Sequence, residues 1–177
     1  YKRQGLLILQ IGLWRVFAVA PQLKVQTADS ELPDTSLTVV VPAYNEAVNI
    51  AACLQSVLNS IPPCTDWSVL VVDDASTDAT AEMAHQTALD HSKICSVLQA
   101  GPRPQGELWV GKNWACSRAM EQVTSKWVLF IDADVRLRPD ALRRALGQAI
   151  EESADLFSLA PRLECGCLAE WMVQPIM

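Results

Sequence analysis

The sequence has few histidines and few basic residues, and its cysteines lack the spacing of a metal site. Its 177 residues include two histidines and six cysteines. No Cys-x-x-Cys pair occurs, so neither a structural zinc site nor a dense disulfide framework is predicted. Fourteen lysines and arginines against 20 acidic residues give a formal net charge of −6, which disfavours a nucleic-acid partner. The cysteines therefore indicate buried thiols in a reducing compartment.

Three sequence motifs that mark other classes of protein are also missing. No Gly-x-Gly-x-x-Gly follows the first apolar run, which argues against a dinucleotide-binding oxidoreductase. Gly106 and Gly111 have the spacing of a P-loop, but Asn113 stands where that motif needs serine or threonine. The amino-terminal segment lacks the small-residue cleavage pattern of a secretory signal.

Half of the residues are apolar, and their pattern is typical of an α/β fold. Short, continuously apolar runs, which predict strands covered on both faces, alternate with longer stretches that have apolar residues at helical spacing. The predicted strands are residues 37–41, 68–72, 94–98, 127–131 and 154–159, and the predicted helices are roughly residues 46–60, 77–91, 113–124 and 139–152. We therefore predict a Rossmann-like, mostly parallel sheet with helices on both faces.

The two ends of the sequence depart from this pattern. Residues 1–21 are strongly apolar but contain Gln10 and Arg15, which predicts a membrane anchor or an interfacial helix, with a helix packed on a soluble domain as the alternative. The other predicted divisions are a polar linker at 22–36, one domain at 37–160 and the start of a further region at 161–177. Because the sequence opens at Tyr1 and stops at Met177 within an apolar stretch, we expect it to be part of a longer chain.

Two aspartates follow the fourth predicted strand. If the backbone stays extended past Ile131, the side chains of Asp132 and Asp134 share a face, so two carboxylates converge. Such like charges repel unless a cation or a hydrogen-bond donor lies between them, and hard oxygen ligands favour Mg²⁺ or Mn²⁺ with open positions for substrate phosphates. The alternative is that one aspartate caps the next helix and the other is merely solvated.

Charged residues also follow other predicted strands. Asp73 and Asp74 end the second strand, where carboxylates are suited to accept hydrogen bonds from base N–H groups or ribose hydroxyls. Asp78 alone is explained by helix capping. Lys112 precedes a predicted helix start at Asn113, where a cation and free amide groups favour a diphosphate; a solvated surface lysine is the alternative.

Four segments, taken in chain order, resemble family 2 glycosyltransferases of the GT-A fold. They are Val41-Pro-Ala-Tyr-Asn-Glu46, Val72-Asp-Asp-Ala-Ser-Thr-Asp78, Gly111-Lys-Asn-Trp-Ala115 and Phe130-Ile-Asp-Ala-Asp134. The resemblance covers residues 37–160 and, within the family, is greatest to the membrane-associated, hopanoid-linked branch. It implies a GT-A-like fold and the metal-assisted transfer of a sugar, with inversion, from a UDP-linked donor to an acceptor hydroxyl.

The resemblance also implies roles for individual residues. The nucleotide-sugar pocket would be lined by Pro42, Ala43, Tyr44, Glu46, Asp73, Asp74 and Asp132, with Lys112 at the diphosphate as argued above. Asp73 would bind the uracil-type base, and Asp74 would lie near it. Asp132 would face the ribose or the metal, and Asp134 would be a direct ligand of Mg²⁺ or Mn²⁺. Residues 37–160 would then be the nucleotide-sugar-binding domain.

Inverting transferases also require a carboxylate base for the acceptor. We expect this base beyond Met177, so the catalytic residue is unknown and the chain is expected to be a truncated, inactive donor-binding half. One alternative is a haloacid-dehalogenase-like phosphotransferase with Asp132 as nucleophile and Asp134 as acid or base. The other is a non-catalytic nucleotide-sugar-binding module.

The acceptor and the location follow from the apolar ends. If residues 1–21 touch a bilayer, the acceptor is expected to be a lipid, a carotenoid or another isoprenoid, and the apolar Leu168–Met177 fits a helix at the membrane surface. We therefore expect membrane association with the catalytic domain on the cytoplasmic side.

Overall fold

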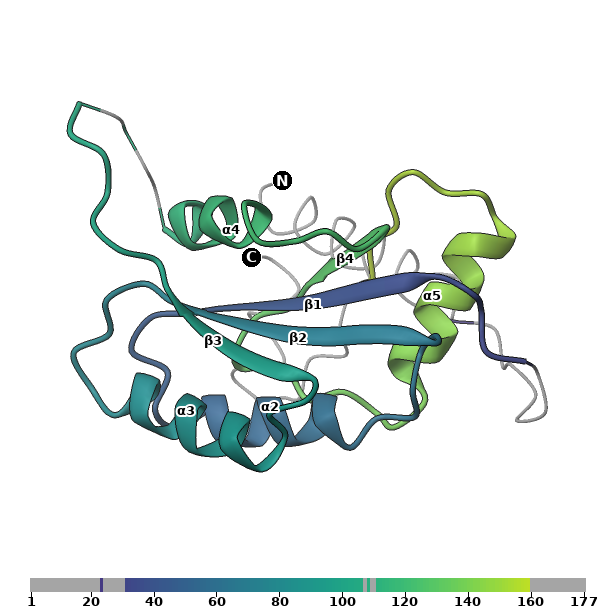
Figure 1. Ribbon diagram of the computed structural model, residues 1–177, viewed down its shortest axis with the longest axis horizontal. Helices are drawn as coiled ribbons and strands as arrows, with labels where there is room; N and C mark the ends of the chain where they lie inside the picture. The colour runs from purple at the N-terminus through teal and green to yellow at the C-terminus, as the bar shows by residue number, and fades with distance from the viewer. Residues whose placement is uncertain (1–22, 24–30, 107, 109–110, 160–177) are drawn as a thin grey trace, which may run out of the picture. The chain divides into compact units, whose positions relative to one another are not determined.

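The computed structural model describes residues 23, 31–106, 108 and 111–159. Their elements, in chain order, are β1 (Ser36–Ala43), α2 (Ile50–Leu58), β2 (Asp66–Asp73), α3 (Thr80–Asp90), β3 (Cys95–Gln99), α4 (Asn113–Met120), β4 (Trp127–Phe130) and α5 (Ala141–Glu151). The strands form one parallel sheet in the order β3-β2-β1-β4 (Figure 1). The predicted α/β fold with a parallel sheet is confirmed.

Helices cover both faces of the sheet, as predicted. Successive residues of a strand point to opposite faces, so the odd-numbered residues of β1 share a core with α2, α3 and α5, while Val40 packs with α4 (Figure 1). The larger core contains Val39, Val41, Val69, Val71, Ile50, Leu54, Val57, Ala84, Leu142 and Leu146. Continuous runs of apolar residues form strands here because both sheet faces are buried.

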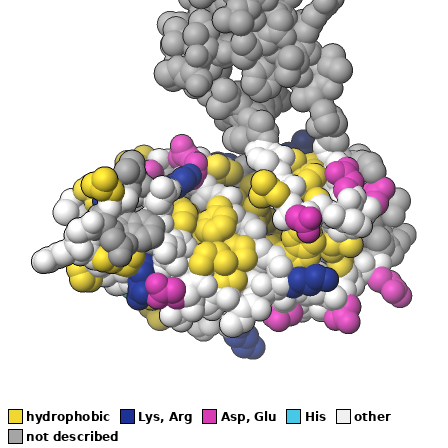
Figure 2. Space-filling model, turned by 90° about the horizontal axis from the view of Figure 1, so that it is seen from above, with side chains coloured by type: hydrophobic (Ala, Val, Ile, Leu, Met, Phe, Trp, Pro, Cys, Tyr) yellow, Lys and Arg dark blue, Asp and Glu magenta, His cyan; other side chains and the backbone are white. Residues whose placement is uncertain are grey.

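Among the described residues, fewer side chains are buried on the α4 face than on the other face. Phe130 pairs with Val40 and lies on this face, yet it is 45% exposed. Figure 2, seen from the α4 side, shows hydrophobic side chains at the surface. A cavity of about 340 Å³ also opens toward the amino-terminal half of the strands, where its lining includes Thr38, Ser68 and Ser96.

The fifth predicted strand, residues 154–159, is wrong. Helix α5 ends in a turn in which Ser153 has a positive φ of 50° and the amide of Ala154 donates to the carbonyl of Ala149, an arrangement that terminates helices. The residues that follow form no strand, and Leu156 is 89% exposed. This apolar run contains no β-branched residue, so local preference for a strand is weak.

Residues 25–155 belong to one compact unit. A second unit, made of residues 1–24 and 156–177, lies almost entirely outside the described residues. The predicted anchor at 1–21, most of the linker at 22–36 and the region at 161–177 also lie outside them. Among the described helices, none has the length and apolar character needed to cross a bilayer.

Candidate functional site

The carboxyl ends of β1, β2 and β4 meet at one edge of the sheet. Ala43 is the register partner of Asp73, and its carbonyl accepts a hydrogen bond of 2.9 Å from the amide of Asp74. On the other side of β1, the amide of Ile131 donates to the carbonyl of Val40 at 3.0 Å. The two predicted aspartate pairs therefore follow neighbours of the same central strand, at the edge where ligands bind in open parallel sheets.

Asp73 is buried, with 2% of its surface exposed. Its Oδ2 accepts a hydrogen bond of 3.3 Å from the amide of Ser76, whereas its Oδ1 is buried and has no hydrogen-bond partner among the described residues. Buried polar atoms in folded proteins are nearly always hydrogen-bonded, because an unpaired one costs about 1–3 kcal/mol. The unpaired oxygen is therefore an acceptor that suits an incoming N–H or O–H group.

Asp74 is neutralised by a residue that the sequence analysis missed. Nη2 of Arg103 lies 2.6 Å from Oδ2 of Asp74, with 7% of the Asp74 side chain and 45% of the Arg103 side chain exposed. The same Nη2 lies 3.5 Å from the carbonyl oxygen of Gly111. Arg103 thus joins a buried acid of β2 to the segment that leads into α4.

The residues predicted after β1 divide into buried and exposed ones. Pro42 and Ala43 are the last residues of β1, and both are buried, so their side chains are covered by the rest of the fold. Tyr44 is 58% exposed. Glu46 is partly buried: its Oε2 accepts from Nδ2 of Asn49 at 3.0 Å, and its amide donates to Oγ1 of Thr80 at 2.7 Å. Of these four, only Tyr44 presents most of its side chain to solvent.

Further hydrogen bonds join the loop after β1 to the loop after β2. Asn45 has a positive φ of 54°, a conformation that asparagine tolerates better than most residues. Its amide donates to Oγ of Ser76 at 3.0 Å, and its Oδ1 accepts from the amide of Thr77 at 2.8 Å. Oδ2 of Asp78 accepts from the amide of Ala47 at 3.2 Å. The two loops are therefore held together.

Asp78 also bonds to the start of α3. Its Oδ1 accepts from the amide of Thr80 at 3.0 Å and from the Thr80 hydroxyl. The Thr80 hydroxyl is the main reason why the pKa of this carboxyl is lowered, and the amides of Thr80 and Ala47 act in the same direction. The N-cap of α3 is Ala79, and no side chain caps the helix there, so the predicted capping role of Asp78 is wrong. Asp78 instead bonds to the first residue of the helix from the position before the cap.

Asp132 and Asp134 lie on a turn, so the backbone does not stay extended past Ile131, which was the condition for the shared face. Strand β4 already ends at Phe130, and the amide of Val135 donates to the carbonyl of Asp132 at 3.0 Å, which closes the turn. Both aspartates are exposed, whereas Ala133 between them is 3% exposed. The buried alanine fixes the turn while both carboxylates face solvent.

Lys112 pairs with the first of these aspartates. Its Nζ forms an ion pair with Oδ1 of Asp132, and both side chains are 56% exposed. As predicted, α4 begins directly after it, at Asn113. Lys112 thus brings positive charge to the turn that carries Asp132 and Asp134, which we call the aspartate turn. It lies 20 positions before Asp132 in the chain.

The donor set fits a divalent cation only together with a ligand. Within the described residues, no three His, Cys, Asp or Glu side chains gather as a metal site would require. Mg²⁺ and Mn²⁺, however, commonly take one or two carboxylates and complete their coordination with water and substrate phosphates. The exposed carboxylates of Asp132 and Asp134 match that second type of site.

Cys53 lies against the aspartate turn. It is fully buried on α2, and its Sγ donates to the carbonyl oxygen of Asp132 at 3.7 Å. Burial raises the pKa of the Cys53 thiol to about 11; the charges of Asp134 and Glu46 raise it as well, and Arg136 lowers it. The thiol is therefore protonated at neutral pH and remains a donor.

The family model for glycosyl transferase family 2 matches residues 38–175. The chain belongs to this family. The match includes the carboxyl ends of β1, β2 and β4, which confirms the family resemblance and, together with the solved structures below, the GT-A-like fold.

Curated relatives of this family 2 chain are longer than it is. A 4,4'-diaponeurosporenoate glycosyltransferase of Staphylococcus aureus (strain bovine RF122 / ET3-1) is 31% identical over 148 residues, which cover 82% of this chain and 36% of the relative. The uncharacterized glycosyltransferase YibD of Escherichia coli (strain K12) is 26% identical over 135 residues, 76% of this chain and 34% of the relative. The chain thus spans about a third of the length of these relatives.

Two solved structures support the same assignment of fold. A mannosyltransferase of Pyrobaculum calidifontis, in complex with GDP-Man and Mn²⁺, has a TM-score of 0.60 and 26% identity, covering 79% of this chain and 39% of that one. S. aureus TarS 1-349 in complex with UDP-GlcNAc has a TM-score of 0.53 and 26% identity, covering 67% and 32%. The alternative of a haloacid-dehalogenase-like phosphotransferase gains no support from these comparisons.

The thiols bear on one further expectation, and the cavity lies away from the aspartates. Cys53, Cys64 and Cys95 are free and buried, as predicted, and Cys116 is partly exposed. Cys165 and Cys167 lie outside the described residues. The 340 Å³ cavity lies toward the amino-terminal half of the strands. It therefore does not coincide with the edge where Asp73, Asp74, Asp132 and Asp134 lie, which we call the aspartate edge.

Proposed function

We propose that this family 2 chain binds the nucleotide-sugar donor of a glycosyltransferase that transfers a sugar, with inversion, to an acceptor hydroxyl. The observation that carries the proposal is the pairing of a buried, unpartnered acceptor at Asp73 with two exposed carboxylates at Asp132 and Asp134, on strands either side of β1. A nucleoside diphosphate suits both features, because its base offers N–H donors and its negative diphosphate binds to a divalent cation that carboxylates hold.

Asp73 is proposed to accept the ring N–H of a uracil-type base. Its Oδ2 is already held by the amide of Ser76, which leaves Oδ1 for the ligand. Tyr44, exposed beside the end of β1, offers an aromatic surface next to the base. Solved relatives carry either GDP-Man or UDP-GlcNAc, and guanine also presents a ring N–H, so the donor base is tested with both nucleotides below.

The aspartate turn is proposed to hold the cation and the diphosphate. Asp134, and Asp132 beside it, would be the protein ligands of Mg²⁺ or Mn²⁺, and the bound cation supplies charge that stabilises the leaving diphosphate. Lys112 places an ammonium group at Asp132, from where it contacts phosphate oxygens as a point charge. Among the described residues we assign none as the base for the acceptor.

The acceptor is proposed to be a lipid, a carotenoid or another isoprenoid presented at a membrane. Two observations support this: the apolar residues 1–21 of the sequence and the relative named for 4,4'-diaponeurosporenoate, a carotenoid-related compound. Association with the membrane, the donor domain on its cytoplasmic side and a place near the hopanoid-linked branch stay predictions. Vesicle flotation of the chain with and without residues 1–21 tests the first of them.

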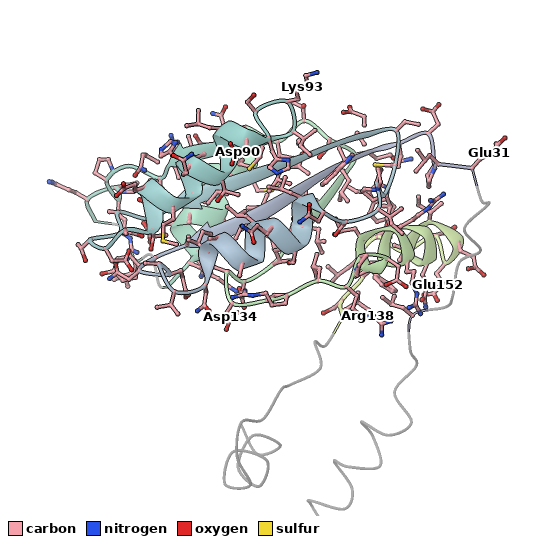
Figure 3. The ribbon with its side chains drawn as sticks, turned by 90° about the horizontal axis from the view of Figure 1, so that it is seen from below. Glu31, Asp90, Lys93, Asp134, Arg138 and Glu152 are labelled. Atoms are coloured by element: carbon pink, nitrogen blue, oxygen red, sulfur yellow. The ribbon has the colours of Figure 1, made fainter. Side chains whose placement is uncertain are left out.

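Calorimetric titration with UDP and with GDP, each with and without Mn²⁺, tests donor binding. We expect binding of one nucleotide that requires the metal and is lost in Asp134→Ala. The matched control is Asp90→Ala. Asp90 is an exposed acid at the end of α3, just before β3 begins, so it lies toward the amino-terminal ends of the strands and away from Asp134 (Figure 3). Equal affinity of the unaltered chain and Asp134→Ala would contradict the assignment of the turn.

Release of free sugar from a panel of nucleotide sugars distinguishes an enzyme from a binding module. If nucleotide binds as expected but a chain extended to the length of the relatives releases and transfers no sugar, the non-catalytic alternative holds. Phosphatase activity that disappears in Asp132→Asn would instead favour the phosphotransferase.

A further inference from the structure

Helix α2 presents three side chains to the segment that carries the aspartate turn. They are Asn49, which immediately precedes the helix, Cys53 and Ser56, and we call them the α2 clamp. Their spacing of four and three residues places them on one face of a helix. Figure 3 shows Asp134 on the loop that runs beside α2.

Each member of the clamp makes a hydrogen bond to that segment. The Cys53 thiol donates to the carbonyl oxygen of Asp132 at 3.7 Å, and Oγ of Ser56 accepts from the amide of Leu137 at 3.1 Å. Oδ1 of Asn49 accepts from Nη2 of Arg136 at 3.3 Å. The clamp thus contacts both ends of residues 132–137, although it lies about 80 residues earlier in the sequence.

Arg136 extends the contact into the turn itself. Its Nη1 donates to the carbonyl oxygens of Ala133 at 3.3 Å and of Val135 at 3.0 Å. Asn49, which holds the other guanidinium nitrogen, also donates from Nδ2 to Oε2 of Glu46 at 3.0 Å. A continuous chain of side chains therefore joins the loop after β1 to the backbone of the aspartate turn.

We infer that the α2 clamp consists of positioning residues that fix the Asp132–Asp134 turn for the cation and the diphosphate. This inference rests on the proposed function. The Asp134 carboxylate is exposed, and the Asp132 carboxylate is exposed beside Lys112, so the backbone of the turn decides where both side chains begin. That backbone is held on one side by α2 and Arg136. Groups that orient metal ligands in this way typically contribute about tenfold or more to metal affinity.

The test compares clamp variants with a matched helix variant. Ser60 lies just beyond α2, and its hydroxyl donates to the carbonyl of Ser56 at 2.9 Å rather than to the segment 132–137, so Ser60→Ala is the control. For the double variant Asn49→Ala with Ser56→Ala, we expect the affinity for UDP with Mn²⁺ to fall about tenfold. Cys53→Ala should weaken binding and Cys53→Ser, which keeps a donor, should retain it.

A second measurement does not depend on ligand binding. The amide of Val135 closes the turn, so its hydrogen exchange without ligand should speed up in the clamp variants and stay unchanged in Ser60→Ala. Should the double variant fail to fold, Ser56→Ala alone is measured in the same way. Urea unfolding of each variant separates a loss of binding from a loss of stability.

The outcomes separate this inference from the proposed function. If the unaltered chain binds neither UDP nor GDP with Mn²⁺, the proposed function fails. If it binds, but the clamp variants match Ser60→Ala in affinity and in Val135 exchange, the proposed function stands and the clamp is overturned as a positioning device. Loss of affinity in Cys53→Ser equal to that in Cys53→Ala would remove Cys53 from the clamp.

Discussion

The two halves of the aspartate edge hold their acids in opposite ways. On the β2 side, Asp73 and Asp74 are 2% and 8% exposed and sit among loops joined by hydrogen bonds. On the β4 side, Asp132 and Asp134 are exposed on a turn. Each half also has a basic partner: a half-exposed Arg103 faces the buried Asp74, and an exposed Lys112 faces the exposed Asp132.

This contrast indicates that the two halves have different roles in binding. A buried acceptor in fixed geometry discriminates between ligands, because a ligand without the matching donor leaves it unpaired. Exposed carboxylates keep their hydration and their freedom to exchange one cation for another, which suits a metal that arrives with the nucleotide. The β2 half is thus suited to recognise the base and the β4 half to hold charge.

The largest effect expected from a change in the β2 half is on nucleotide binding in Asp73→Asn. The carboxylate can accept from the amide of Ser76 with one oxygen and from a base N–H with the other. An asparagine has an NH₂ group in place of one of these oxygens, so it meets one of the two N–H donors with another donor. We expect affinity for the nucleotide to fall about tenfold to hundredfold while the free energy of unfolding is kept, since the unpaired oxygen is removed. Calorimetry and urea denaturation measure the two quantities. Unchanged affinity would show that the β2 half does not recognise the base.

The next effect contrasts the two basic partners in stability. Arg103→Ala leaves the carboxylate of Asp74 buried without its cation, so the free energy of unfolding should fall by about 1–3 kcal/mol. Lys112→Ala breaks an exposed pair, which contributes less than about 1 kcal/mol. Urea denaturation without ligand checks both, and Arg103→Lys, which keeps the charge, serves as the control. Equal losses in the two alanine variants would erase the difference between the halves.

A smaller effect of opposite sign is expected for metal binding in Lys112→Met. The ammonium group competes with a cation for Asp132, so its removal should raise the affinity for Mn²⁺ alone by about two- to fivefold. In the presence of UDP the loss of a phosphate contact should offset this gain. Titration with Mn²⁺, with and without UDP, measures the change. A fall in affinity for Mn²⁺ alone would contradict the role of Lys112 as a displaceable counter-ion.

Local sequence pattern predicted the elements of this edge well and their contacts poorly. The runs at 37–41 and 68–72 form strands because their apolar residues fill both sheet faces. The run at 154–159 looked similar but has no β-branched residues and forms no strand. Apolarity alone does not distinguish a paired strand from an unpaired segment.

The contacts of the site could not be predicted because they join distant residues. Arg103 and Asp74 are 29 positions apart, and Cys53 and Asp132 are 79 apart. Arg103 lies in a loop rich in proline and glycine that carries no periodic pattern, and Cys53 resembles any buried cysteine. The aspartates themselves were predictable because their position after apolar strands marks the edge where ligands bind.

The smallest expected effect concerns acid pH and the β2 half. The pKa of Asp78 is lowered by its hydrogen bonds, first of all from the Thr80 hydroxyl. In the unfolded chain this carboxyl takes up its proton at a higher pH than in the folded chain, so its contribution is present above the ordinary pKa of an aspartate and is lost as pH falls through the lowered pKa. In Asp78→Asn this part of the acid dependence should be missing. The carboxyl is ionised at roughly pH 5 to 7, so the difference in unfolding free energy between Asp78→Asn and the unaltered chain should be constant there. The difference should shrink below about pH 4. A difference that stays constant into acid would show that the ionised carboxylate adds nothing to the bonds between the β1 and β2 loops, and that neutral hydrogen bonds alone hold the buried half of the edge.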